Sequence, residues 1–168
     1  MWFLVMMTAL SAVLWIAESP LRRRFVLTKL LLWIVLGSVL APIFASGGPC
    51  YYARLADVPD PYTPLWQLLD GSGVQAREIQ GWLWSVMQEP WSWRPFTGIS
   101  AMPSLHVAQA TLVACFAWRS TQWSIRLAGL AYLALVQVGS VVLGWHYAID
   151  GYVAIAITIG LWRVVGRV

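Results

Sequence analysis

The stretch Ile125–Val165, IRLAGLAYLALVQVGSVVLGWHYAIDGYVAIAITIGLWRVV, decides the fold of this chain. It contains two apolar runs, Ile125–Leu143 and Tyr147–Val165, which are separated by a short turn that includes His146. Each run is close to the ~20 residues that an α-helix needs to cross a ~30 Å hydrocarbon layer. The stretch therefore predicts two membrane helices joined by a turn that carries a histidine.

The rest of the chain has the same character. The sequence is 60% hydrophobic and 11% charged, with 12 tryptophans, and three more apolar runs lie at Met1–Ala17, Phe25–Ala45 and Val107–Trp118. The last of these is long enough to span only if its helix begins at Pro103. Such long unbroken runs exclude a β-barrel. We predict an all-α integral membrane helical bundle of about five transmembrane helices, in a single membrane-embedded domain over residues 1–168.

The basic residues indicate the orientation of this bundle. With alternating crossings, eight of the eleven basic residues fall on one side, which the positive-inside rule makes cytoplasmic. The net charge of +4 follows from this topology and indicates no nucleic-acid partner. We expect a protein of the cell membrane, of the bacterial inner membrane type, whose active site faces the periplasm or exterior. The eight residues are Arg22, Arg23, Arg24, Lys29, Arg119, Arg126, Arg163 and Arg167.

The segment 46–102 is the one long piece that is not expected to span the membrane. Glycine and proline clusters punctuate it as turns, and between them an apolar stripe recurs at helical spacing. This pattern predicts an amphipathic helix that lies in the membrane interface. Its tryptophans either anchor the protein at the headgroup level or recognise a lipid substrate. The stripe is Ile79, Trp82, Leu83, Val86 and Met87, and the tryptophans are Trp66, Trp82, Trp84, Trp91 and Trp93.

The two histidines of the chain, His106 and His146, are expected to meet. They lie 40 residues apart, which at ~1.5 Å per helical residue is about 60 Å, or two ~30 Å crossings. The connection around Arg119–Ser124 is short enough to make the two helices antiparallel neighbours. Both imidazoles are therefore expected in one pocket outside the cytoplasm.

The residues around the histidines point to anion chemistry. His146 and Asp150 stand at i and i+4, so the carboxylate can accept a hydrogen bond from one ring nitrogen and leave the other as a nucleophile. Pro103 suits a first helical turn, which would leave the amides around Ser104 to His106 free to bind an anion. Ser104 fits either a helix cap or a phosphate contact. Packed or interfacial histidines are the alternative, but the coincidence of these groups near a membrane favours function.

Two segments resemble a known family. The segment 101–108 is AMPSLHVA and the segment 144–150 is GWHYAID. They resemble the second and third signature motifs of the type 2 phosphatidic acid phosphatase superfamily, and most closely its branch of inositol phosphorylceramide synthase-like bacterial proteins. The resemblance implies that His146 attacks phosphorus to form a phosphohistidine, that Asp150 orients and stabilises it, and that His106 protonates the leaving oxygen and then activates the acceptor. Ser104 would help to hold the phosphate.

The chain departs from the family pattern in its cations. The first family motif is a lysine followed seven residues later by Arg-Pro, but here Met87 precedes Arg94-Pro95 at that spacing. The third motif usually has an arginine six residues before its histidine, where this chain has Ser140. Because a transferring phosphoryl group needs positive charge nearby, Arg94 and then Arg77 are the expected substitutes. The alternative for each is a solvated or headgroup-binding arginine.

These observations predict an enzyme, a membrane lipid-phosphate phosphatase or phosphotransferase, that uses no metal and no cofactor. Its substrate is expected to be a lipid phosphate, resolved by water or by an alcohol acceptor such as a lipid headgroup. The shared motifs fit both a hydrolase and a headgroup transferase. A catalytically inactive lipid-binding membrane protein is the alternative class, and the intact set of His106, His146 and Asp150 argues against it.

Overall fold

The computed structural model describes residues 2–16, 19–88 and 100–167. Over this part of the chain the structure is helical and has no strand, which confirms the all-α prediction. A π-helical stretch, Trp33–Leu40, joins α2 to α3 just before Pro42. The α-helices are α1 Trp2–Ile16, α2 Ser19–Leu32, α3 Ala41–Phe44, α4 Tyr52–Ala56, α5 Thr63–Gly71, α6 Ala76–Gln88, α7 Leu105–Ala117, α8 Trp123–Val142 and α9 Ala148–Val165.

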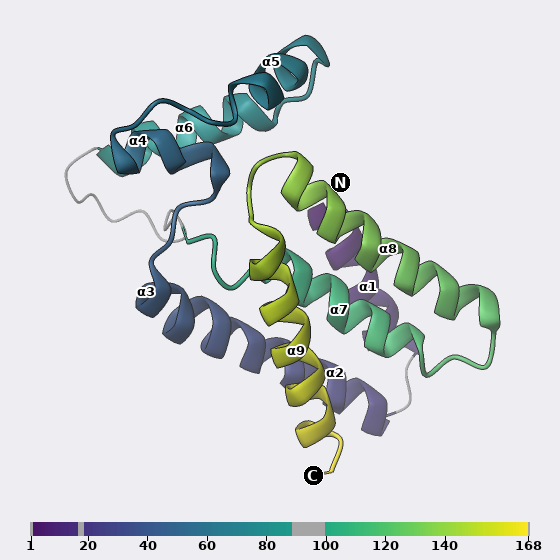
Figure 1. Cartoon of the computed structure of the whole chain (residues 1–168). Coiled ribbons are helices and arrows are strands. Elements are labelled where there is room, and N and C mark those ends of the chain that lie inside the picture. The colour runs from purple at the N-terminus through teal and green to yellow at the C-terminus, as the bar shows by residue number, and fades with distance from the viewer. Residues whose placement is uncertain (1, 17–18, 89–99, 168) are drawn as a thin grey trace.

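The helices form a bundle with a smaller layer at one end (Figure 1). The bundle contains α1, the continuous rod from α2 to α3, and the C-terminal helices α7, α8 and α9. The layer contains α4, α5 and α6 together with the segment 48–51 that leads into α4, and we call it the outer layer. Among the described residues, three helical segments are long and apolar enough to cross a membrane, at Pro20–Ala56, Trp123–Val142 and Ala148–Val165. The apolar helices Val5–Trp15 and Leu105–Ala117 are shorter.

The helix α7 lies at the centre of the bundle and contacts α1, α2, α8 and α9. It is buried almost all round, and its many alanines let the neighbouring backbones approach closely. On α8, a Cβ at Gly129 would lie 2.7 Å from the Ala117 Cβ, so glycine is required where these two helices touch. The buried residues of α7 are Val107, Ala108, Gln109, Ala110, Thr111, Leu112, Ala114 and Ala117.

The start of α7 differs from the prediction. The helix begins at Leu105 with Ser104 as its N-cap, so Pro103 precedes the helix and is not part of its first turn. The Ser104 hydroxyl accepts a hydrogen bond from the Val107 amide at 3.4 Å, and this cap sets the first residue of the helix.

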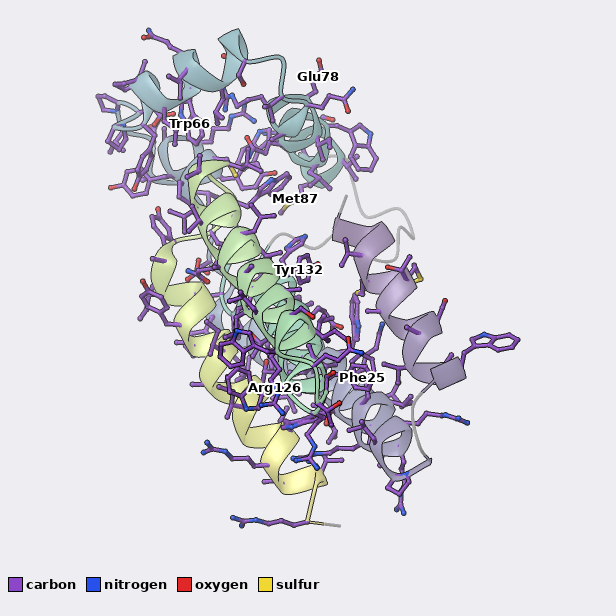
Figure 2. The ribbon with its side chains drawn as sticks, turned by 90° about the vertical axis from the view of Figure 1, so that its right-hand side faces the viewer. Phe25, Trp66, Glu78, Met87, Arg126 and Tyr132 are labelled. Carbon is purple, nitrogen blue, oxygen red and sulfur yellow. The ribbon has the colours of Figure 1, made fainter. Side chains whose placement is uncertain are left out.

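The outer layer contains the predicted amphipathic helix as α6. Part of its apolar stripe is exposed, since Ile79, Trp82 and Met87 are about half exposed, whereas Val86 is buried. Met87 and Glu78 lie on this helix in Figure 2. By contrast, Gln80 is buried at 2% exposure. The exposed apolar side chains of α6 fit a helix that rests in the membrane interface.

One tryptophan expected at the interface is in the core instead. Trp66 on α5 is 5% exposed, and its indole Nε1 donates a 2.6 Å hydrogen bond to Asp60 Oδ2. The prediction was wrong here because the indole N–H of a tryptophan needs a hydrogen-bond acceptor, and a carboxylate inside the protein can supply one as well as a lipid headgroup can. Trp91 and Trp93 lie outside the described residues.

The outer layer holds the turn between α8 and α9. The Cys50 amide donates to the Gly144 carbonyl at 3.0 Å, and Gln80 Nε2 donates to the Leu143 carbonyl at 2.8 Å. A Cβ at Gly48 would collide with the Trp145 carbonyl. Gly144 has φ +73° and lies against the Trp66 ring. The turn that carries His146 is therefore shaped by residues far away in the sequence.

Gly144→Ala should lower the stability of the folded protein. The left-handed conformation costs an L-residue about 1–2 kcal/mol, and the added methyl group would collide with the Trp66 ring. We expect a clearly lower melting temperature in detergent. Gly160→Ala is the matched control, because Gly160 lies in α9 and a Cβ there would meet no atom within 4 Å. Equal melting temperatures for the two variants would contradict this account of the turn.

Candidate active site

The two histidines lie side by side. His106 is in the first turn of α7 and His146 is in the turn before α9, and His106 Nδ1 lies 3.4 Å from His146 Nε2. The ring centroids are 5.6 Å apart and the planes are tilted by 61°. His146 is 6% exposed, whereas His106 is partly exposed. The structure thus brings together two titratable rings that are 40 residues apart in the chain.

The other nitrogen of His146 is held by the backbone. His146 Nδ1 lies 2.7 Å from the Ala101 carbonyl oxygen. A carbonyl can only accept, so the neutral ring carries its proton on Nδ1 and its lone pair on Nε2, next to His106. This arrangement leaves Nε2 as the nucleophilic nitrogen.

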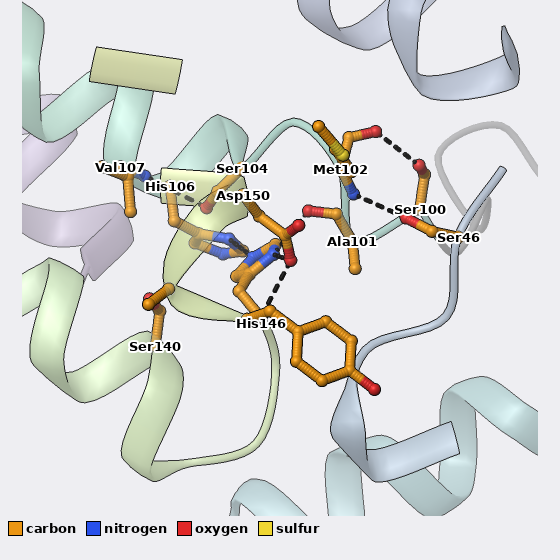
Figure 3. A network of polar contacts seen from close by, with 12 residues as sticks. Ser46, Ser100, Ala101, Met102, Ser104, His106, Val107, Ser140, His146 and Asp150 are labelled. Carbon is orange, nitrogen blue, oxygen red and sulfur yellow. Dashed lines mark hydrogen bonds and ion pairs between the residues drawn. The ribbon is translucent and has the colours of Figure 1, made fainter. Parts of the chain in front are cut away.

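The Ala101 carbonyl is itself fixed by Ser46, at the end of the α2–α3 rod (Figure 3). The Ala101 amide donates to the Ser46 carbonyl at 2.7 Å, and the Met102 amide donates to Ser46 Oγ at 3.1 Å. The Ser100 hydroxyl lies 3.1 Å from the Ala41 carbonyl and 3.0 Å from the Met102 carbonyl. Two parts of the chain, the end of the α2–α3 rod and the segment before α7, therefore position the imidazole of His146. Sequence reasoning missed this set, because the group that contacts the ring is a backbone carbonyl, which every residue carries.

Asp150 lies close to His146 but does not make the expected hydrogen bond. Its Oδ2 is 3.9 Å from His146 Nδ1 and accepts instead from the Tyr147 amide at 2.8 Å. Both side chains are buried. The carboxylate caps the first turn of α9 and leaves its negative charge beside the ring. The difference arises because the Ala101 carbonyl occupies the hydrogen-bonding direction of Nδ1.

Ser104 is fully buried as the cap of α7. Its own amide donates to the Asp150 carbonyl at 3.2 Å. The expectation that the amides from Ser104 onward are unpaired is therefore wrong for Ser104 itself. The bond ties the start of α7 to the first turn of α9, the helix that follows His146.

Ser140 stands where the family pattern has an arginine. It is 8% exposed, and its carbonyl accepts from the Trp145 amide at 3.0 Å and from the His146 amide at 3.2 Å. At this position the chain thus has no cation, and its backbone carbonyl holds the turn that carries His146 through two hydrogen bonds.

The structure describes only one of the two arginines expected near the phosphate, Arg77. Arg94 lies outside the described residues. Arg77 lies on α6 in the outer layer, where its Nε is 3.3 Å from Asp70 Oδ1 and its guanidinium lies 4.7 Å from the centroid of the Trp66 ring. The structure therefore gives Arg77 partners within the outer layer and does not bring it to the histidines.

The environment of His146 favours its neutral form. Burial is the largest cause, and the charge of His106 acts in the same direction, whereas the hydrogen bond to the Ala101 carbonyl opposes them. Together they lower the pKa of His146 from its ordinary value near 6.5 to about 4. At neutral pH the ring is therefore unprotonated at Nε2, as a nucleophile requires.

Comparison with known proteins identifies the family. A family model described as the PAP2 superfamily matches residues 1–164. No curated protein and no solved structure matches the chain. The chain belongs to the PAP2 superfamily, and membership supports activity of the phosphatase or phosphotransferase type in general. The match extends well upstream of the two motifs. Within the described residues no group of three or more His, Cys, Asp or Glu side chains is placed to hold a metal ion.

The titration of His146 tests this account of the site. NMR of histidine labelled with ¹⁵N, in detergent micelles, should show His146 neutral down to about pH 5 and half-protonated near pH 4. Because the folded-state pKa lies below the unfolded value near 6.5, stability from this group is complete above about pH 6.5 and is lost as the pH falls toward 4. In His106→Asn, which removes one cause, the pKa of His146 should rise but stay below 6.5. A midpoint near 6.5 in the unmodified protein would contradict the proposed burial.

Proposed function

We propose that this protein is a membrane lipid-phosphate phosphatase or phosphotransferase that works through a phosphohistidine on His146 Nε2. The observation that carries the proposal is the histidine pair, with His146 Nε2 3.4 Å from His106 Nδ1 and His146 Nδ1 held by a carbonyl. Membership of the PAP2 superfamily supports the same class of reaction. The substrate class is a lipid phosphate, because the site lies at one end of a bundle built from apolar helices.

In the first step, His146 Nε2 attacks the phosphorus and the bond from phosphorus to the leaving oxygen breaks. His106, in its protonated form, donates a proton to that oxygen. The two imidazoles must separate for this step, because at 3.4 Å their nitrogens leave no room for a phosphoryl group between them. The Asp150 carboxylate, 3.9 Å from His146 Nδ1, stabilises the positive charge that the ring gains.

In the second step, His106 takes a proton from the acceptor, and the acceptor oxygen attacks the phosphohistidine. The bond between phosphorus and Nε2 breaks and His146 is regenerated. Water as acceptor makes the protein a phosphatase, and an alcohol such as a lipid headgroup makes it a transferase of the inositol phosphorylceramide synthase type. The same residues serve both reactions, so the acceptor is decided by what enters the site.

Holding the phosphoryl group requires positive charge. We assign this role to Arg94, ten residues before Ser104, and keep Ser104 as a contact through its place at the start of α7. Arg77 is assigned to substrate or membrane association, because Asp70 already balances its charge.

We also propose that the site faces away from the cytoplasm. The described arginines outside the outer layer gather at the opposite end of the bundle from the histidines. Arg22, Arg23 and Arg24 begin α2, Arg119 and Arg126 lie in the turn after α7 and the start of α8, and Arg163 and Arg167 lie at the end of α9 and just after it. By the positive-inside rule that end is cytoplasmic. The outer layer and the histidines would then lie in the periplasm or exterior leaflet.

Substitutions at the histidines test the mechanism. His146→Ala should lower turnover by about a thousandfold or more, because the covalent route is removed. His106→Ala should cost about 10²–10⁴-fold. Asp150→Asn should fall between these and the parent, since an amide oxygen can still accept from the Tyr147 amide while the charge is lost. The measurement is phosphate release from a panel of lipid phosphates, with and without alcohol acceptors.

A labelling experiment and a control variant make this test specific. A ³²P-labelled substrate should leave an acid-labile label on the parent protein and none on His146→Ala. Tyr152→Phe is the matched control, because Tyr152 lies in α9 two residues after Asp150 and its side chain is 59% exposed. Turnover near the parent level in His146→Ala would overturn the proposal.

Cysteine labelling tests the sidedness. In a protein with Cys50 and Cys115 replaced, Ser72→Cys in the outer layer should react with a membrane-impermeant thiol reagent in intact cells. Thr121→Cys, in the exposed turn between α7 and α8, should react only after the membrane is opened. The reverse pattern would place the active site in the cytoplasm.

A further inference from the structure

A cavity lies at the arginine-rich end of the bundle. It has a volume of about 920 Å³, within the ~300–1,000 Å³ typical of ligand sites. Its walls come from α1, α2, the turn after α7, the start of α8 and the end of α9. His106 and Ala117, at opposite ends of α7, are about 17 Å apart at ~1.5 Å per residue. The cavity is therefore distinct from the histidine site.

The polar part of the cavity is positively charged. Arg23, Arg24 and Arg119 line it, together with Ser120 and Thr121, and no described lining residue is acidic. Like charges in one cavity repel each other, and a bound anion would relieve that repulsion. Arginine is well suited to this role because its planar guanidinium can bind phosphate through two hydrogen bonds.

The walls of the cavity are held in place by contacts outside it. Arg24 donates from Nε and Nη2 to the Trp162 carbonyl at 2.9 and 2.7 Å, and its guanidinium lies 4.1 Å from the centroid of the Trp162 ring. Arg126 donates to the Ser120 carbonyl at 2.7 Å and so braces the turn that carries Arg119. Figure 2 shows Arg126 in the bundle, away from Trp66 and Glu78 in the outer layer. The side chains of Arg23 and Arg119 are exposed.

The rest of the lining is apolar. Leu27 and Ile125 are 37% and 43% exposed, and Phe116, which also lines the cavity, packs against the buried core. A small inorganic anion would leave this apolar surface uncovered. A ligand with a phosphate at one end and hydrocarbon at the other would satisfy both parts, and basic pockets between membrane helices on the cytoplasmic side bind lipid headgroups in this way.

We propose that this cavity binds one anionic phospholipid, with its phosphate at Arg23, Arg24 and Arg119 and its acyl chains along Leu27, Phe116 and Ile125. The lipid is a bound component of the bundle and not the substrate, because it lies at the other end of α7 from the histidines. The proposal therefore does not depend on the proposed reaction. The bound lipid would bridge α2 and the start of α8, which make few direct contacts with each other.

The test compares lipids and variants in neutral detergent. Native mass spectrometry and thermal melting are measured with added phosphatidylglycerol, phosphatidylcholine or inorganic phosphate. The parent protein should retain phosphatidylglycerol through the mass measurement and melt at a higher temperature with it, with little effect of the other two. Arg23→Gln combined with Arg119→Gln should weaken this binding about tenfold or more, because two charge-assisted contacts are lost. Its melting temperature without lipid shows whether it folds.

Arg163→Gln combined with Arg167→Gln is the matched control, because both residues are exposed at the same end of the bundle and neither lines the cavity. This control should keep the binding, and so should His146→Ala. If the control pair loses lipid binding equally, the binding depends on the overall positive charge of this end of the bundle and not on the cavity. If His146→Ala loses lipid binding, the lipid occupies the histidine site. If inorganic phosphate stabilises the protein as strongly as phosphatidylglycerol does, the ligand of the cavity is a free anion and not a lipid. Each of these three results, or unchanged binding in Arg23→Gln with Arg119→Gln, overturns the proposal.

Discussion

The hydrogen bond from His146 Nδ1 to the Ala101 carbonyl is the contact on which the site depends. It joins two loops that each lead into a helix, one before α7 and one before α9. A second bond, from the Ser104 amide to the Asp150 carbonyl, joins the same two helix starts. Because both bonds use backbone carbonyls, they set the position of the imidazole and its tautomer without any further ionisable group. The lone pair of the neutral His146 ring is therefore placed on Nε2, next to His106, by the fold itself.

Helix packing in the membrane explains why this connection between the starts of α7 and α9 can be rigid. The central helix α7 is short and rich in alanine, so α8 and α9 can pack closely against it and bring their connecting turn over its first residue. Apolar side chains lose little by facing lipid, so the bundle needs few large buried groups. Buried hydroxyls on the helices, such as those of Thr111 and Thr158, donate to the carbonyl four residues earlier in their own helix. The histidines lie at one end of the bundle, and Arg23, Arg24 and Arg119 line the cavity at the other end.

The outer layer turns a generic helical hairpin into a defined site. Contacts from Gly48, Cys50 and Gln80 reach the turn between α8 and α9, and Trp66 covers Gly144. The same layer exposes Ile79, Trp82 and Met87 of α6. The layer therefore holds the histidine turn and also carries exposed apolar side chains suited to the membrane interface.

The sequence by itself determined the helical class, the apolar segments and the pairing of the histidines, because hydrophobic run length and helix rise are local properties that set where each helix ends. It also predicted α6 from spacing alone. Only the tertiary structure decided that Trp66 is buried and that Ser104 caps α7. It also decided that the hydrogen-bond partner of His146 is the Ala101 carbonyl and not Asp150. The physical reason is that a backbone carbonyl carries no sequence signal. Which carbonyl reaches a given ring depends on contacts between segments such as Ser46 and Ala101, which lie 55 residues apart in the chain.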